Sequence, residues 1–495
     1  MKVKNGLTSF ALSLSVLSSY AEEKWMIASQ KDWADNLSTR QGMVLKDGTV
    51  SPVKKQGSLQ TKVKKLSKKR KAKALTIAQS PLWQNWDEVS SVGPSNLKDA
   101  PVFLVKGPND YWIFGRYGFR KSPKGFKPQE VKLEGYDIPL MTTIYKNQFD
   151  APGGLQPRLG GYHAWQSRDM ENWVHHGSVT PGFARWTTTA EQVGGATYIY
   201  YDFPNDQDPH LFIDDDLTDG KPGKNMGLAF ADPSDGSDCA VIRDLDGKFH
   251  IIYEDWSPIN AGQHSWDSPL AGHSVSPNGL HPFKIKKPAV DHRTKPTGKM
   301  AKYNHPHWAK EDPKRFPTND VTYEIHEPEQ DAYGDWAAIS IGGQYYLFCD
   351  FHPAHEKIRI AWFTSSSINE PFEFCGEIGS GHPDPDIGFA EGKFYMVTQT
   401  GHDYLSPGPW VEKVEVRVGV DVSNNGKIDH WTSWKEVKES YDYIPGFSKQ
   451  IKVTPALAAL DDLPAGYGFQ VEMKLTDKTA NPSKPLIKGL ELSFK

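Results

Sequence analysis

Cysteine and long apolar runs are both scarce in this chain. Its 495 residues include three cysteines, Cys239, Cys349 and Cys375, and so small and odd a number excludes a disulfide framework. Cys349 and Cys375 can pair only if neighbouring strands bring them together, and three buried free thiols account for the count equally well. After residue 21, no apolar stretch approaches the ~20 residues that a membrane-spanning helix requires. The composition therefore excludes a disulfide-stapled fold and a helical membrane domain.

The first 21 residues carry the pattern of a secretory signal peptide. Lys2 and Lys4 precede an apolar run over residues 7–17, and a small residue, Ala21, stands at the expected cleavage point. The run is too short to span a membrane, and no cysteine is present there for a lipid anchor. We therefore expect a signal peptide over residues 1–21 and a periplasmic or secreted mature protein.

Acidic residues are missing from one long segment. Residues 53–73 contain ten lysines and arginines and no aspartate or glutamate, in a chain whose formal net charge is −4. Such runs are typical of solvated surfaces or of sites for anionic polymers. We predict that residues 22–80 form a basic, partly helical and solvated N-terminal arm. If the arm has a ligand, a sulfated polysaccharide suits an exported protein better than nucleic acid does.

Glycine, proline and aromatic residues are plentiful. The chain has 43 glycines, 36 prolines, 16 tryptophans, 20 tyrosines and 23 phenylalanines, which suits a large β-protein that turns often. Five times, a short apolar strand that starts with a carboxylate leads through a glycine-containing turn or loop to an aromatic-rich strand. These five strands start at Asp99, Glu191, Asp238, Asp335 and Asp386.

This repeat is typical of a β-propeller. The copies lie roughly 50 to 100 residues apart, more than the ~40 to 50 of a regular blade, which indicates loops inserted between strands. The inner strands of a propeller surround one axis, so their first residues meet on one face. We predict an all-β, five-bladed β-propeller over residues 81–412, with these carboxylates pointing into a central pocket. At any single position, an aspartate that caps a turn is an equally good explanation.

A proline-rich segment, residues 406–410, separates this repeat from a last set of strands. The strands that follow alternate between apolar and polar side chains, as half-buried strands do. They predict a C-terminal β-sandwich-like domain over residues 413–495. Its loop Asp421–Asp429 has alternating oxygen donors like the first half of a calcium loop, but Thr432 stands where an acid is expected. A plain hairpin turn is the simpler interpretation.

The order of Asp99, Asp238 and Asp335 along the repeats resembles that of the five-bladed glycoside hydrolases of families 43, 62 and 117, and family 117 is the closest match. The resemblance implies that Asp99 is the general base and that Asp238 orients the acid and tunes its pKa. It also implies an acid near the start of blade four, where Asp335 stands but these families have glutamate. Glu327, slightly upstream, and Glu191 on blade two are competitors for that role.

Carboxyl groups suit this chemistry because glycosidic cleavage passes through a cation-like sugar. One carboxyl group protonates the leaving oxygen while a second activates a water molecule on the other face of the sugar. Like charges held close together keep one member protonated near neutral pH. A pocket lined by acids from different blades can supply both groups.

Aromatic, cationic and imidazole side chains near the blade ends are candidates for substrate contacts. Flat rings stack on sugar faces, and guanidinium groups bind oxyanions such as sulfate. These candidates, with the last carboxylate of the repeat, are Arg116, Trp165, Arg185, Trp256, His326, Trp336, His382 and Asp386. No histidine spacing matches a standard zinc motif. The resemblance leaves open a calcium or sodium ion in the propeller channel, and we expect no other cofactor.

These observations predict an exported, exo-acting and inverting glycoside hydrolase. The resemblance to family 117 implies release of a terminal sugar, such as 3,6-anhydro-galactose, from red-algal galactan oligosaccharides of the agar or carrageenan type, including sulfated ones. It also implies a homodimer whose helical arms, around residues 66–75, exchange between partners. A non-catalytic carbohydrate-binding propeller and a polysaccharide lyase stay open as alternatives.

Overall fold

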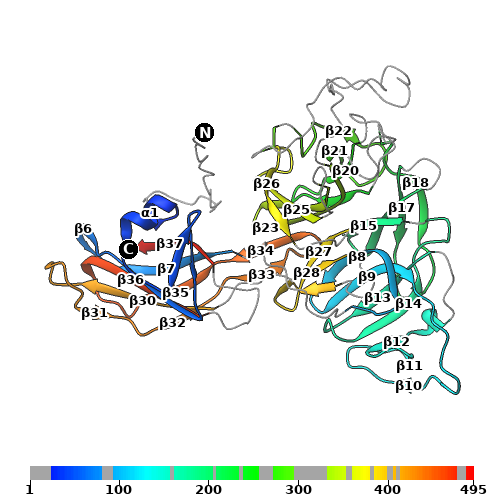
Figure 1. Ribbon diagram of the computed structural model, residues 1–495, viewed down its shortest axis with the longest axis horizontal. Coiled ribbons are helices and arrows are strands. Elements are labelled where there is room, and N and C mark those ends of the chain that lie inside the picture. Colours follow the sequence, from blue (N-terminus) through cyan, green and yellow to red (C-terminus); the bar gives the residue numbers. More distant parts are fainter. Residues whose placement is uncertain are drawn as a thin grey trace.

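The computed structural model describes residues 24–80, 93–155, 161–184, 186–203, 208–232, 238–255, 271–291, 293–294, 332–352, 359–378, 384–398, 405–407, 413–476 and 486–495. Strands form nearly all of the regular structure, in agreement with the predicted all-β class, and they gather in two lobes (Figure 1). Within these ranges, no helix has the length and apolarity to cross a membrane. The predicted signal peptide lies outside the described residues.

Five sheets build the larger lobe, on the right in Figure 1. The first contains β10 (Glu130–Val131), β11 (Leu140–Thr142), β12 (Gln148–Asp150), β14 (Trp173–Ser178), β13 (Tyr162–Ser167), β9 (Asp110–Tyr117) and β8 (Leu97–Gly107), and a 3₁₀ turn, η1 (Pro152–Leu155), lies beside it. The second contains β15 (Trp186–Val193), β16 (Ala196–Asp202), β17 (Pro209–Asp214) and β18 (Lys224–Leu228).

The remaining three sheets of this lobe follow in chain order. The third contains β19 (Ala240–Arg243), β20 (Phe249–Glu254), β21 (Ala271–Ser276) and β22 (Lys284–Ile285). The fourth contains β26 (Glu373–Ile378), β25 (Arg359–Ser365), β24 (Gln344–His352), β23 (Ala332–Ile341), β34 (Gln450–Thr454) and β33 (Ser440–Tyr443). The fifth contains β27 (Asp386–Ala390), β28 (Lys393–Val397) and β29 (Leu405–Pro407).

The innermost strands of these sheets form a closed ring. β8 contacts β15, β15 contacts β19, β19 contacts β23, β23 contacts β27, and β27 returns to β8. Strands packed between neighbouring sheets are buried on both faces: β13 and β20 are buried at every residue. This ring of radiating sheets is the arrangement of a β-propeller.

The smaller lobe is a sandwich of two sheets. One contains β3 (Met43–Lys46), β4 (Thr49–Pro52), β37 (Ile487–Phe494), β7 (Ala72–Gln79) and β35 (Ala456–Ala459), with β1 (Lys24–Ile27) paired to β37. The other contains β2 (Leu37–Gln41), β5 (Gln56–Thr61), β36 (Gly466–Thr476), β30 (Val414–Asp421) and β31 (His430–Trp431), with β32 (Lys435–Val437) paired to β30 and β6 (Lys64–Arg70) to β36. The short helix α1 (Gln30–Asn36) follows β1.

The prediction of a solvated, separate N-terminal arm is wrong. Leu75 and Ile77 of β7 are fully buried in the core that the N-terminal and C-terminal strands share. Helix in this segment is confined to α1, and residues 66–75, expected to form an exchanging helix, lie on β6 and β7. The lysine-rich sequence suggests a solvated arm, but it forms β6, an edge strand. On an edge strand, charged side chains can reach water from either face of the sheet. The partner strands come from the other end of the chain.

The C-terminal segment also differs from the prediction, because it contributes strands to both lobes. β33 and β34 leave the sandwich and run to the propeller (Figure 1). There β34 pairs in parallel with β23, with Ser340 opposite Gln450 and Ile341 opposite Ile451. One propeller sheet is therefore completed by residues that follow all five repeats in sequence.

None of the three cysteines forms a disulfide, and Cys239 and Cys349 are buried. Cys349 lies on β24 and Cys375 on β26, and β25 separates these two strands in the sheet. The structure therefore decides against a disulfide.

Candidate active site

Four aspartates share an unusual backbone conformation at the start of the inner strands. Asp99, Asp238, Asp335 and Asp384 have φ angles of 68°, 29°, 51° and 55°. Residues other than glycine rarely adopt positive φ, although aspartate does so more readily than most. Such local strain persists where the surrounding structure enforces it, and it is common at functional sites. In the second sheet, Thr188 stands at the corresponding shift in register of β15.

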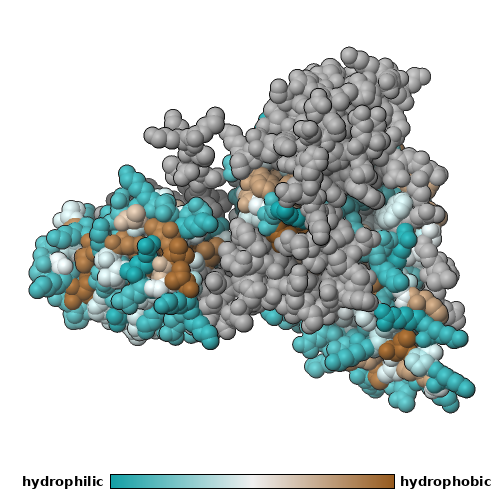
Figure 2. All heavy atoms as spheres, viewed as in Figure 1, coloured by the Kyte–Doolittle hydropathy of each residue, from teal (hydrophilic) through white to brown (hydrophobic). Residues whose placement is uncertain are grey.

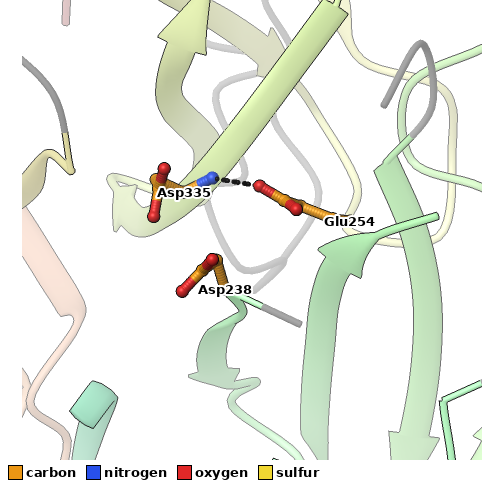
Figure 3. A group of neighbouring side chains, drawn as sticks. All are labelled: Asp238, Glu254 and Asp335. Atoms are coloured by element: carbon orange, nitrogen blue, oxygen red, sulfur yellow. Dashed lines mark hydrogen bonds between the residues drawn. The ribbon is translucent and has the colours of Figure 1, made fainter. Parts of the chain in front are cut away.

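Carboxylates from the neighbouring sheet hold three of these four turns. Each carboxylate lies at or near the end of the second strand of one sheet and accepts a hydrogen bond from the backbone N–H of the aspartate in the next sheet. The three pairs are Asp238 N to Asp202 Oδ2 at 3.4 Å, Asp335 N to Glu254 Oε1 at 3.0 Å (Figure 3), and Asp384 N to Asp350 Oδ1 at 3.0 Å. We call these contacts the inter-sheet clasps. They fix the aspartates and join successive sheets at the same time.

The strand ends surround a pocket that is open to solvent, and the space within it is about 330 Å³ when the open solvent is included. Every one of the five sheets contributes to its wall. The lining residues are Ala100, Pro101, Trp186, Thr187, Thr188, Asp238, Asp335, Trp336, Asp384, Pro385 and Asp386. The pocket thus combines carboxylates with the half-buried indole ring of Trp186, and flat rings of this kind can stack on sugars.

Carboxyl groups crowd around Asp335. Carboxylate oxygens of Asp238, Glu254 and Asp335 lie within 4.8 Å of one another (Figure 3), and so do those of Asp335, Asp350 and Asp384. Burial raises the pKa of Asp335 well above its usual value, and the charges of Asp238, Asp384, Asp350 and Glu254 act in the same direction. Asp335 therefore tends to keep its proton, as a general acid must.

The same oxygens could hold a cation. Carboxylate ligands suit a hard ion such as calcium, and the two triads that meet at Asp335 are the groups of described residues with fitting spacing. Glu254 and Asp350 each already accept a backbone hydrogen bond. A bound cation would compensate the negative charges that favour protonation of Asp335, so cation and proton would compete for this carboxyl group.

Asp99 stands in a different electrostatic environment. Arg116 Nε of β9 lies 2.6 Å from Asp99 Oδ2. Asp99 and Asp335 therefore have different surroundings: Asp99 contacts a guanidinium group, and Asp335 is surrounded by acids.

Tyr162 is a polar group near the aspartates that the sequence did not reveal. It lies opposite Arg116 in the β9–β13 pair, is fully buried, and its hydroxyl has no hydrogen-bond partner among the described residues. Burial raises its pKa well above the usual value, and the charges of Asp99, Asp384 and Asp238 contribute. The phenol is therefore a donor close to three pocket carboxylates.

The structure brings together most of the predicted site residues that it describes. Asp238, Asp335, Trp336 and Asp386 line the pocket, and Arg116 pairs with Asp99, which precedes the lining residue Ala100 in the chain. The other predicted residues, Arg185, Trp256, His326, Glu327 and His382, lie outside the described residues.

Two predicted residues lie elsewhere. Glu191 is at the far end of β15 from the pocket, where its Oε1 accepts a hydrogen bond from Ser448 N at 2.8 Å, and burial raises its pKa to about 7. The prediction failed because Thr188, earlier on the same strand, faces the pocket. Trp165 is fully buried and stacks on Tyr117 with ring centroids 6.2 Å apart. It is a core residue rather than a sugar platform.

A readable signal for the missed clasp residues exists in the sequence. The second strands of three successive sheets carry an acid at or near their ends: Asp202 follows Tyr201, Glu254 follows Tyr253, and Asp350 lies two residues before the end of β24. A strand interior seldom carries an unpaired charge, so an acid at each strand end indicates a partner on the neighbouring sheet. Arg116 ends the corresponding strand of the first sheet and pairs with Asp99 instead.

The Asp421–Asp429 loop forms a turn in which the carboxylates bind backbone amides. Asp421 accepts hydrogen bonds from Asn425 N and Gly426 N at 3.2 and 2.7 Å. Asp429 accepts hydrogen bonds from Val422 N and Ser423 N at 2.6 and 3.0 Å. These contacts explain the oxygen-rich sequence by local turn geometry.

Comparison with known proteins finds no family model and no curated protein that matches this chain. Solved structures do show likeness. A GH43_1 enzyme from Xanthomonas citri has 12% identity and a TM-score of 0.38, covering 71% of this chain and 93% of its own. An endo-arabinase from Bacteroides thetaiotaomicron has 10% identity and a TM-score of 0.37, covering 66% and 98%. At these identities and TM-scores, the likenesses carry no argument about the activity of this chain.

Proposed function

We propose that this protein is a glycoside hydrolase whose active site is the acid-lined pocket of a five-bladed propeller. One observation carries the proposal: the pocket holds Asp335, which is crowded by other acids and inclined to stay protonated. Asp99, which precedes the lining residue Ala100 and contacts Arg116, is a second carboxyl group from another sheet. Hydrolysis of a glycosidic bond needs two carboxyl groups, one that donates a proton and one that activates water. A binding protein needs neither.

The residues divide the reaction between them. Asp335 protonates the leaving oxygen, and Asp99 removes a proton from the attacking water. Asp238, whose carboxylate oxygen lies within 4.8 Å of one of Asp335, orients the acid and raises its pKa. Trp186, which is half-buried at the pocket, offers a ring face to the sugar, whereas Trp336 is buried against Tyr333 and Phe363 and supports the pocket wall. Glu327 stays the competitor of Asp335 for the acid role.

We also propose where the enzyme acts and which substrate it cleaves. We assign an exported, exo-acting and inverting enzyme that releases a terminal sugar, such as 3,6-anhydro-galactose, from red-algal galactan oligosaccharides. The lysines of β6 support a sulfated substrate: Lys64, Lys65, Lys68 and Lys69 are exposed and form no ion pair with a described residue. Hydrophilic side chains dominate the outer end of the smaller lobe, the sandwich, where β6 lies (Figures 1 and 2).

The first test is incubation of the purified protein with agar, porphyran and carrageenan oligosaccharides, followed by chromatography of the products. Release of a single terminal sugar is expected. Unsaturated products would indicate a lyase, and binding without any product would indicate a carbohydrate-binding propeller.

Substitutions then test the roles. Asp99→Asn and Asp238→Asn should each lower kcat about 100-fold or more, with circular dichroism unchanged. Asp335→Asn should lose activity on natural linkages but keep it on an aryl glycoside with a good leaving group, because that group needs no proton. If Glu327→Gln shows this rescue and Asp335→Asn does not, Glu327 is the acid. Near-normal activity of both Asp99→Asn and Asp238→Asn would contradict the proposal.

A further inference from the structure

A hairpin from the C-terminal segment enters the axis of the propeller. Its strands, β33 and β34, belong to the sheet of β23, and its tip spans residues 444–449. Ser340 N donates to Lys449 O and Gly342 N donates to Ile451 O, both at 2.8 Å, so the fourth sheet holds the hairpin by its backbone. We call the segment 440–454 the axial hairpin.

The residues at the end of the tip contact the inner strands of other sheets. Ser448 N donates to Glu191 Oε1 of the second sheet at 2.8 Å. Gln450 Nε2 donates to Arg243 O of the third sheet at 2.7 Å. With the fourth sheet already bound, these contacts place the tip among the inner ends of the sheets, on the propeller axis.

Lys449 extends this set of contacts to the last and first sheets. Its side chain is 2% exposed, and its Nζ donates to Thr189 Oγ1 at 2.8 Å and lies 3.6 Å from Asp386 Oδ1. Asp386 is 4% exposed, and its Oδ2 accepts a hydrogen bond from Phe103 N of the first sheet at 2.9 Å. A buried lysine is costly unless it is paired, so Lys449 and Asp386 stabilise each other as ions.

The pair lies directly behind the pocket. Asp386 is itself a lining residue, and one proline separates it from Asp384, whose carboxylate approaches that of Asp335. We propose that Lys449 is a positioning residue of the active site: its ammonium group holds the Asp386 carboxylate, and through it the Asp384–Asp386 turn, against the acid cluster. This inference rests on the proposed glycoside hydrolase function.

The surroundings of the pair define what its loss would do. Among the described residues, Arg243 acts electrostatically on Glu191 beside the pair, and Tyr443 interacts with both Glu191 and Asp386. Burial raises the pKa of Asp386, and Lys449 and two backbone N–H groups oppose that rise. Without the ammonium group, the Asp386 carboxylate loses a contact that holds it, and the turn can move. Such a movement alters the charges around Asp335.

The test compares Lys449→Met, Lys449→Arg and the double variant Lys449→Met/Asp386→Asn with the wild type. Lys452→Met, an exposed lysine on the same strand β34, is the matched control. We expect Lys449→Met to lower kcat about tenfold or more with a smaller change in KM and a displaced pH profile of kcat. Lys449→Arg should restore part of kcat and the profile. The double variant should be closer to wild type than Lys449→Met, because removing both charges leaves no buried unpaired ion.

A second readout needs no substrate, so it separates failure of this inference from failure of the proposed function. Lys449→Met leaves the buried Asp386 carboxylate without its cationic partner, so the midpoint of thermal unfolding should fall clearly below that of Lys452→Met. The double variant should recover part of this loss. A midpoint of Lys449→Met equal to that of Lys452→Met, or a kcat and pH profile equal to those of Lys452→Met, would overturn the inference. If no sugar is released by any variant, the wild type included, but Lys449→Met is selectively destabilised and the double variant recovers, the pairing stands and the hydrolase assignment falls.

Discussion

Four aspartates at the starts of inner strands have positive φ angles, and three of them, Asp99, Asp238 and Asp335, carry the proposed chemistry. The clasps from Asp202, Glu254 and Asp350 bind the backbone of three of the four, so each clasp both fixes a strained turn and brings a second carboxylate to it. Around Asp335, the clasp carboxylates of Glu254 and Asp350 also favour the protonated acid. Position and protonation therefore have the same structural cause.

The substitution Glu254→Gln separates these two effects. Glutamine keeps an oxygen that can accept the hydrogen bond from Asp335 N, but it removes one of the charges that raise the pKa of Asp335. The pKa of the acid should fall, and since the acid must be protonated to act, the alkaline limb of the kcat/KM profile should move to lower pH. Glu370→Gln, an exposed position, should leave the profile in place. An unmoved limb in Glu254→Gln would remove Asp335 from the acid role.

At the scale of elements, the ring closes where the last inner strand meets the first. β27 and β8 approach closely because Gly388 of β27 has no side chain. A Cβ atom there would lie 1.9 Å from Cδ1 and 2.1 Å from Cε1 of the Phe103 ring. The hydrogen bond from Phe103 N to Asp386 lies beside this contact. Closure of the ring of inner strands thus depends on Gly388, the Phe103 ring and the Asp386 carboxylate.

Gly388→Ala should therefore destabilise the propeller lobe. The added methyl group forces the Phe103 ring out of a buried site, and overpacking of this kind costs about 1–3 kcal/mol. Chemical denaturation should show an earlier midpoint for this variant. Gly195→Ala is the control, because its Cβ would meet nothing within 4 Å, and its midpoint should stay at the wild-type value. Equal midpoints for the two variants would show that β8 and β27 can separate without cost.

At the scale of the whole molecule, the two lobes depend on each other. The sandwich needs both ends of the chain, because β7 lies between β37 and β35. The propeller needs the axial hairpin, because Glu191, Asp386 and Thr189 would otherwise be buried without the partners that Ser448 and Lys449 supply. Strands between residues 97 and 407 are therefore not an independent unit.

A fragment of residues 81–412 tests this dependence. We expect it to be insoluble, or to lack the cooperative thermal transition of the full-length protein, because Glu191, Thr189 and Asp386 each lose a buried hydrogen-bond or ionic partner. The measurement is calorimetry of the soluble fraction beside the full-length chain. A fragment with a cooperative transition at the wild-type temperature would show that the hairpin is dispensable.

The sequence predicts the acids that start strands, because local alternation and turn residues mark where a strand begins. Asp99, Asp238 and Asp335 were found because each starts a strand with a local pattern of alternation and turns. Glu191 was misplaced because a strand pattern does not say which end faces the pocket. The sequence predicts Asp386 rather than Asp384 as the pocket acid of the last repeat, because the two lie only two residues apart at the start of the same apolar strand, β27.

The sequence by itself determined the strands, their repeat and the acids at their ends, because these follow from the two-residue period of a strand and from turn residues close by in the chain. Only the tertiary structure decided which distant strands pair. It joined the two ends of the chain in one sandwich and carried Lys449 to the propeller axis. Pairing between distant strands depends on which apolar faces can be buried together and which buried charges can be matched. Those requirements apply to the closed molecule as a whole and leave little trace in any local stretch of residues.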